Sequence, residues 1–186
     1  MNNLSDKVIN AINQLQNKKD SIIIAIDGRS AAGKTTFAEA LSDALDCNVF
    51  HGDDFFLQKE QRTRERLSQA GENIDYERLI EEVIIPIQKG VEFSFRPFDC
   101  HTMDFGAEIN VTPKKINIIE GAYCCNSHIY DYADIHVFMD IDNKTQHQRI
   151  LDRNGADAEM FFTKWIPMEE RYFKEQKIKE KCGIKN

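Results

Sequence analysis

The stretch from Ser21 to Thr35, SIIIAIDGRSAAGKT, decides the fold. Residues 21–27 are apolar and mostly β-branched up to the final aspartate, which is typical of a strand buried on both faces of a parallel sheet. Residues 28–35 match G-x-x-x-x-G-K-[ST], in which the glycines let the backbone curl around phosphates and the next helix directs its positive end at them. The stretch therefore predicts binding of a nucleoside triphosphate.

Each part of this loop has an expected role. Lys34 would reach the β and γ phosphates, and the Thr35 hydroxyl would bind Mg²⁺. A chain of this length matches the pattern by chance about once in a hundred, and the flanking strand and helix lower that figure. We expect MgATP to be held by the following residues: Gly28, Arg29, Ser30, Ala31, Ala32, Gly33, Lys34, Thr35 and Thr36.

The rest of the chain alternates strand and helix patterns. Strands are expected at 47–50, 116–119 and 135–139, and a strand or hairpin arm at 92–98. Helices are expected at 34–45, 75–89, 142–154 and from Pro167 onward, with Pro86 kinking or ending the second. This order predicts one domain over residues 1–186. Its fold class is α/β, a P-loop NTPase-type three-layer α/β/α arrangement with a mostly parallel sheet, a small β-hairpin insertion and a helical lid.

Composition narrows the class of protein. The net charge of −7 argues against nonspecific nucleic-acid binding, and the purest apolar run, 22–26, is far too short to cross a membrane. Residues 1–19 have helical apolar spacing rather than a signal peptide. The five cysteines are odd in number and lack metal-site spacing, which indicates reduced thiols and a cytoplasmic location. The expected partner is a small-molecule substrate, and a homo-oligomer remains possible.

Other P-loop classes lack support. A GTPase needs Asn-Lys-x-Asp, and the nearest match, NKTQ at 143–146, lacks the aspartate. No Ser-Gly-Gly signature of transporter ATPases occurs, and the strand at 116–119 ends in Glu-Gly rather than the Asp-Glu pair of remodelling ATPases. A small-molecule kinase is the class that remains.

Acidic residues follow two of the expected strands and should meet the loop at one edge of the sheet. Asp53 is the candidate base for an acceptor hydroxyl, and Glu120 the candidate Mg²⁺ partner, directly or through water. Arg149 and Arg153 lie four residues apart on one helical face and could clamp phosphates from a lid, with Lys34 as the remaining catalytic candidate. Asp53 could instead belong to a simple turn, and the two arginines to a solvated helix face.

Five motifs together resemble the uridine kinase and phosphoribulokinase-like P-loop kinases, in particular short bacterial uridine kinase-like proteins. They are 28–36, 53–56, 73–76, 96–99 and 118–121, and the resemblance covers about residues 22–182. It implies transfer of the ATP γ-phosphate to a ribose 5′-hydroxyl, with Asp53 as base, Glu120 at the metal and Arg149 and Arg153 in the lid. It also implies that the following residues bind substrate: Asp53, Asp75, Tyr76, Arg96, Phe98, Asp99 and His101.

The sequence departs from the family pattern in the acceptor half. Phe98 stands where a base-contacting tyrosine is usual, and His101 matches the following histidine only loosely. Uridine or cytidine is the leading acceptor. A kinase of pantothenate, ribosylnicotinamide or a sugar phosphate would look similar at the phosphate end, and a non-catalytic ATP-binding regulatory module is the rival from another class.

Overall fold

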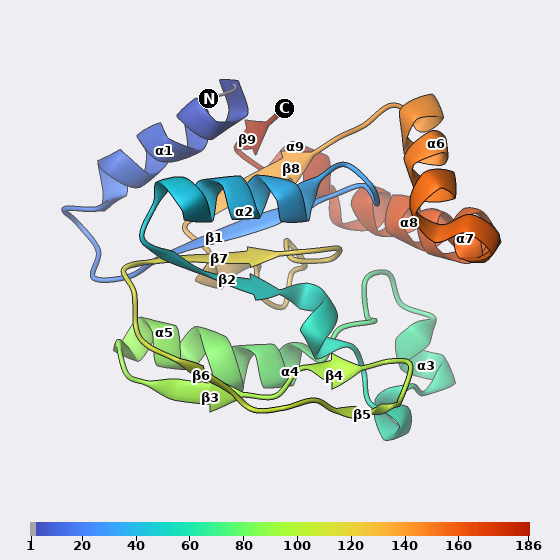
Figure 1. Ribbon diagram of the computed structural model, residues 1–186, viewed down its shortest axis with the longest axis horizontal. Coiled ribbons are helices and arrows are strands. Elements are labelled where there is room, and N and C mark those ends of the chain that lie inside the picture. Colours follow the sequence, from blue (N-terminus) through green and yellow to red (C-terminus); the bar gives the residue numbers. More distant parts are fainter. Residues whose placement is uncertain (1–2) are drawn as a thin grey trace.

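The core of the molecule is a parallel five-stranded sheet in the order β2-β7-β1-β8-β9. The computed structural model describes residues 3–186, with helices on both sides of the sheet (Figure 1). The strands are β1 (Ile22–Gly28), β2 (Cys47–His51), β7 (Ile116–Glu120), β8 (Ile135–Met139) and β9 (Ile184–Lys185). The first four lie in the expected segments, whereas β9 has too short an apolar pattern to be predicted.

Alternate residues of β1 face two separate cores. Ile22, Ile24 and Ile26 pack with α1 (Asn3–Leu15) and α2 (Lys34–Ala44) on one face. Ile23 and Ala25 pack with the helices of the opposite face. Every residue of β1 is therefore buried, which explains its unbroken apolar run. The predicted three-layer α/β/α fold is confirmed, and the expected N-terminal helix is α1; residues 1 and 2 lie outside the described part.

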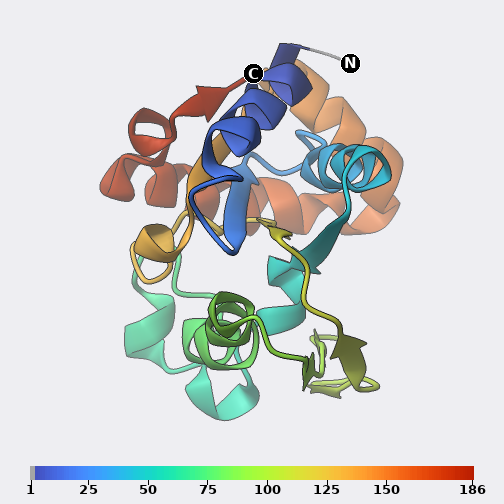
Figure 2. The same ribbon diagram turned by 90° about the vertical axis from the view of Figure 1, so that its left-hand side faces the viewer.

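The segment between β2 and β7 forms a separate tier below the sheet (Figure 2). It contains the short helices η1 (Gly52–Phe55), η2 (Lys59–Gln61) and α3 (Arg64–Leu67), then the run α4 (Tyr76–Leu79), η3 (Ile80–Ile84) and α5 (Ile85–Lys89). Two small antiparallel pairs follow, β3 (Phe93–Phe95) with β6 (Ile109–Val111) and β4 (Phe98–Asp99) with β5 (Asp104–Phe105). These pairs are the expected hairpin insertion.

Pro86 does not end the helix, which was one of the two effects predicted for it. The chain stays helical from Tyr76 to Lys89 because η3, a π-helical turn, comes just before the proline. The N–H of Ile85 bonds to the carbonyl of Ile80, five residues back. A π turn adds one residue to the helix, which lets the proline ring follow without ending it.

The last helix also contains a π turn, and its helical structure starts before Pro167, where the sequence predicted the start. Helical structure already begins at Ala158 and runs through α7 (Ala158–Met160), the π turn η6 (Phe161–Trp165) and α8 (Ile166–Gln176). Lys177, with φ 52°, ends α8 before α9 (Ile178–Lys181). With α6 (Asn143–Asn154) and η5 (Gly155–Asp157), α7 and η6 form the expected helical lid. None of the helices within 3–186 is long and apolar enough to cross a lipid bilayer.

Candidate active site

The loop between β1 and α2 needs glycine where it leaves the sheet. Gly28 has φ 138°, and a Cβ there would lie 2.0 Å from the carbonyl oxygen of Met139 at the end of β8. Gly33, with φ 91°, turns the chain into α2. The two glycines of the motif therefore allow the close approach and the turn that shape the loop.

Several backbone N–H groups of the loop are available as hydrogen-bond donors to a ligand. The N–H groups of Gly28, Arg29, Ser30 and Ala32 bond to protein oxygens. Within residues 3–186, the N–H groups that start α2 and those of Ala31 and Gly33 have no hydrogen-bond partner. Such a run of free donors at the positive end of a helix suits an anion. Lys34 lies over it, its Nζ donating to the carbonyls of Gly28 (2.8 Å) and Arg29 (3.1 Å).

Glu120 joins the loop to the neighbouring strand end. It is the last residue of β7, beside Ile26 of β1 and His51 of β2, and its side chain is buried. Its Oε1 accepts from the Thr35 hydroxyl at 3.0 Å and lies 2.7 Å from Nδ1 of His51. The hydrogen bond to Glu120 raises the pKa of His51. This is the pair of oxygen donors that the sequence predicted for Mg²⁺.

Asp53 lies in η1, directly after β2, as the strand-end argument expected. Its carboxyl reaches solvent, yet the protein around it removes enough hydration to raise its pKa. Lys34 lowers that pKa, Glu120 raises it, and Arg153 of the lid lowers it slightly. These opposing effects place Asp53 within charge–charge range of the loop lysine, Glu120 and the lid.

The two lid arginines differ in what they contact. Arg149 donates from Nη1 to the carbonyl of Ala31 at 3.0 Å, so it touches the loop itself. Arg153 bonds to Asn154 and stacks on Phe161, with its guanidinium 5.3 Å from the ring centroid. One arginine therefore braces the loop, while the other lies near Asp53 in the lid.

In the acceptor half, two of the proposed substrate residues are engaged within the protein. Asp75 is fully buried; its Oδ1 caps α4 through the N–H of Arg78 and its Oδ2 accepts from Gln61 at 2.7 Å. Tyr76 is buried as well, and its hydroxyl donates to the carbonyl of Gly71 at 2.6 Å. Neither side chain reaches a ligand in this arrangement.

The remaining four residues that were predicted to bind substrate lie in the hairpin insertion. Arg96 donates to the carbonyls of Phe105 and Gly106 and so braces the two arms. Phe98 is buried with its ring edge-on to that of Phe105, 5.5 Å between centroids. Asp99 accepts from the N–H of His101 in the turn, and the His101 side chain is exposed. The residues share one hairpin, in which Phe98 is buried while Arg96, Asp99 and His101 are exposed to solvent.

Sequence reasoning missed two acidic residues that bind the loop. Asp27, fully buried at the end of β1, accepts from the N–H groups of Gly28 and Cys125 and from the hydroxyl of Tyr172. Glu169 of α8 bonds to Ser30 from the far end of the chain. An aspartate closing an apolar strand was a usable signal. For Glu169 the pattern showed only an acidic residue near a helix N-terminus.

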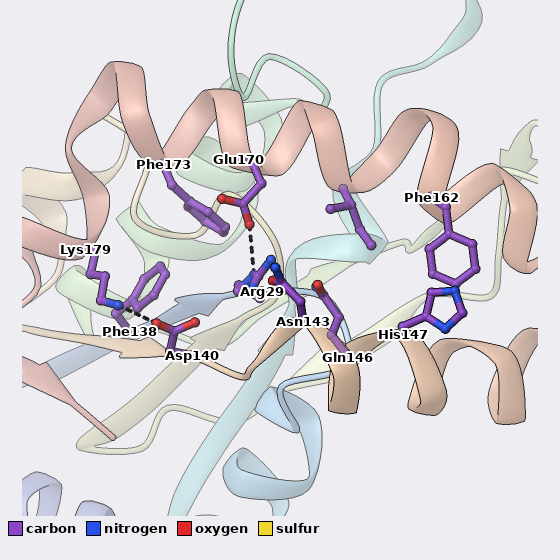
Figure 3. A pocket seen from close by; sticks show the side chains of 11 residues that line it. Arg29, Phe138, Asp140, Asn143, Gln146, His147, Phe162, Glu170, Phe173 and Lys179 are labelled. Carbon is purple, nitrogen blue, oxygen red and sulfur yellow. Dashed lines mark hydrogen bonds and ion pairs between the residues drawn. The ribbon is translucent and has the colours of Figure 1, made fainter.

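A groove of about 610 Å³ opens beside the loop, between α6 and α8 (Figure 3). Arg29 extends into it and pairs with Glu170 at 2.9 Å. Lys179 pairs with Asp140 at one end, and His147 stacks on Phe162 at the other. The groove contains charged side chains of both signs and separates α6 from α8.

The fold and the loop together define a P-loop kinase-type protein. Residues 23–159 match the Phosphoribulokinase / Uridine kinase family, and the chain belongs to that family. It is therefore a kinase of the uridine kinase and phosphoribulokinase type, a phosphotransferase for which the family implies ATP and a small-molecule substrate.

Solved structures show the same fold. A protein described as a possible uridine kinase from Bacillus stearothermophilus is similar with a TM-score of 0.67 and 19% identity, over 96% of this chain and 98% of the other. D-glycerate 3-kinase from Cryptococcus neoformans gives 0.64 and 13%, over 89% and 86%. A Dictyostelium discoideum protein described as a probable gluconokinase is 34% identical over 61 residues, which are 32% of this chain and 30% of that protein. That match covers about a third of either chain.

Proposed function

We propose that this protein transfers the γ-phosphate of ATP to a hydroxyl of a small polyhydroxylated acceptor, with Asp53 as the general base. One observation carries the proposal: Asp53 follows β2 two residues after His51, which pairs with Glu120 at the end of β7, so the carboxyl lies at the same sheet edge as the loop. Phosphoryl transfer needs little covalent chemistry from a protein, so catalysis rests on positioning and on cations around the phosphates. A carboxylate beside those cations can take the acceptor proton.

Each loop residue has a part in this proposal. The free N–H groups between Ala31 and Thr36 would hold the phosphates, and Lys34 would move from the loop carbonyls to the β and γ phosphates. Arg153 would neutralise charge on the transferred group from the lid. Asp53 would orient the acceptor hydroxyl and remove its proton as the new P–O bond forms.

Thr35 and Glu120 would hold Mg²⁺ through their side-chain oxygens, and the ion would supply positive charge to neutralise the phosphates. Their oxygens lie 3.0 Å apart at the edge of the loop. Within residues 3–186 no cluster of three or more His, Cys, Asp or Glu side chains could hold a metal alone. This agrees with Mg²⁺, which usually takes one or two protein ligands and completes its shell with phosphates and water.

Removing the Glu120 charge should weaken the metal requirement of the reaction. Glu120→Gln keeps the hydrogen bond from Thr35 but lacks the anion that favours Mg²⁺ near it. We expect the Mg²⁺ concentration for half-maximal activity to rise at least ~10-fold, in line with other residues that tune metal sites. A magnesium titration at fixed ATP measures this. An unchanged midpoint would contradict the assignment of Glu120.

Uridine or cytidine is the leading acceptor, on the strength of the family. A second class, sugars and sugar acids, is favoured by two contacts: both oxygens of Asp75 are occupied, and Phe98 is buried against Phe105. A carboxylate in use as a helix cap is a poor partner for the ribose hydroxyls, and a buried ring is a poor platform for a base. Both classes share the phosphate half of the site.

An acceptor panel with MgATP tests the function. Uridine, cytidine, neutral sugars, gluconate and glycerate are compared by the ADP each releases above the no-acceptor background. We expect one of these classes to stimulate ADP release, and Lys34→Ala to abolish the response. A flat result across a broad set of hydroxyl compounds would overturn the kinase assignment of the acceptor site and favour an ATP-binding regulatory module.

We also propose that the protein acts in the cytoplasm.

A further inference from the structure

The phosphate loop is held by side chains of α6, which belongs to the lid, and of α8, which follows the lid. From α6, Gln146 donates to the carbonyl of Ser30 at 3.1 Å, and Arg149 donates to that of Ala31. From α8, Glu169 and Glu170 contact the loop with their carboxylates. Residues separated from the loop by more than 100 positions thus fix its outer backbone.

Glu169 makes the most enclosed of these contacts. Its side chain is 3% exposed, and both of its oxygens bond to Ser30. Oε2 accepts from the Ser30 N–H at 3.1 Å, and Oε1 accepts from the Ser30 hydroxyl at 2.5 Å. The N–H of Ser30 is thereby satisfied on the outer side of the loop, whereas those of Ala31 and Gly33 remain free.

The charge of Glu169 works against the ligand that the loop would hold. The carboxylate lies close enough to Lys34 for their charges to interact. An anion so near the phosphate site repels a triphosphate, and burial of the carboxylate adds a desolvation cost. Repulsion of the phosphates therefore favours a neutral side chain at this position, whereas the two hydrogen bonds to Ser30 favour a carboxylate.

We infer that Glu169 is a positioning residue that sets the phosphate loop in its ATP-binding shape through Ser30. The inference rests on the proposed function and extends it to α8. The Arg29–Glu170 pair accompanies this contact across the groove between α6 and α8 (Figure 3). Since α8 continues directly from the lid turn η6, Glu169 connects the loop to the helix that follows the lid.

Glu169→Ala separates geometry from charge because the two predict opposite results. Alanine removes the anion together with both acceptor oxygens, whereas glutamine could still accept from the Ser30 N–H and donate to the Ser30 hydroxyl oxygen. We expect MgATP, titrated directly by calorimetry, to bind ~10-fold more weakly, the usual effect of losing a hydrogen bond to a charged group. Binding that is unchanged, or tighter because an anion has been removed, would overturn the inference.

Two further variants guard the result. Glu175→Ala, on the same helix but half exposed and paired with Arg171, removes the same charge and should leave binding unchanged. Ser30→Ala removes one hydrogen bond and keeps the carboxylate; it should weaken MgATP binding if Glu169→Ala does not fold, and unaltered binding in Ser30→Ala would also count against the inference. The KM for ATP should rise in Ser30→Ala and in Glu169→Ala, with kcat at saturating ATP little changed. Failure of the wild type to bind MgATP would instead refute the proposed function.

Discussion

Asp53→Asn is expected to lower phosphotransfer at least ~100-fold, the usual contribution of general base catalysis, while MgATP binds nearly as in the wild type. Asparagine has almost the same size but cannot accept the acceptor proton. Asp53 lies in η1, directly after β2, and not among the N–H donors of the phosphate loop. Steady-state kinetics with the true acceptor and a direct ATP titration measure the two quantities.

Asp54→Asn is the matched control because it makes the same change one residue later. Burial raises the pKa of both carboxyls, but the positive charge that acts most on Asp53 is Lys34, whereas on Asp54 it is His51. We expect a small effect at Asp54. Normal phosphate transfer by Asp53→Asn, or equal losses in both variants, would show that the base lies elsewhere.

The pH profile provides an independent check on Asp53. Reduced hydration raises its pKa above the ordinary 3.8. The base works only when ionised, so kcat/KM should fall as the pH drops through this raised value. The acid limb should therefore lie above pH 3.8 and should vanish in the residual activity of Asp53→Asn.

The second large effect concerns stability. Asp27→Ala is expected to lower the free energy of unfolding by ~3 kcal/mol, because it leaves several buried donors without an acceptor. Those donors are the N–H groups of Gly28 (2.6 Å) and Cys125 (2.9 Å) and the hydroxyl of Tyr172 (2.7 Å). They tie β1 to the segment after β7 and to α8. Urea unfolding measures the loss.

Asp20→Ala serves as the control, since Asp20 is exposed just before β1 and its removal changes the net charge equally. A surface change of this kind should stay within about 0.5 kcal/mol of the wild type. Equal midpoints for Asp27→Ala and the wild type would mean that the buried donors find other acceptors. Asp27→Asn should also destabilise, because its NH₂ would meet donors.

Features that follow from a local motif or from the general rule for parallel sheets were predictable from the sequence, whereas individual side-chain contacts between distant residues were not. The phosphate loop follows from a local motif, and the arrival of Asp53 and Glu120 at one edge follows from the rule for parallel strand ends. The cap that occupies Asp75 depends on Gln61 folding back onto it. The Ser30–Glu169 contact spans 139 positions, and no local pattern signals it. Acceptor specificity depends on contacts of this second kind, so the sequence predicts the phosphate half of the site better than the acceptor half.

The two π turns have a consequence for comparing this chain with its relatives. Each turn contains one residue more than the same stretch of α-helix. A relative with an unbroken α-helix in place of η6 would be one residue shorter there, and an alignment without a gap would be shifted by one position. Because Glu169 and Glu170 are adjacent and identical, residue identity would not reveal the error. Only one of these two carboxylates bonds to Ser30, so an evolutionary comparison must be anchored on the structure of this helix.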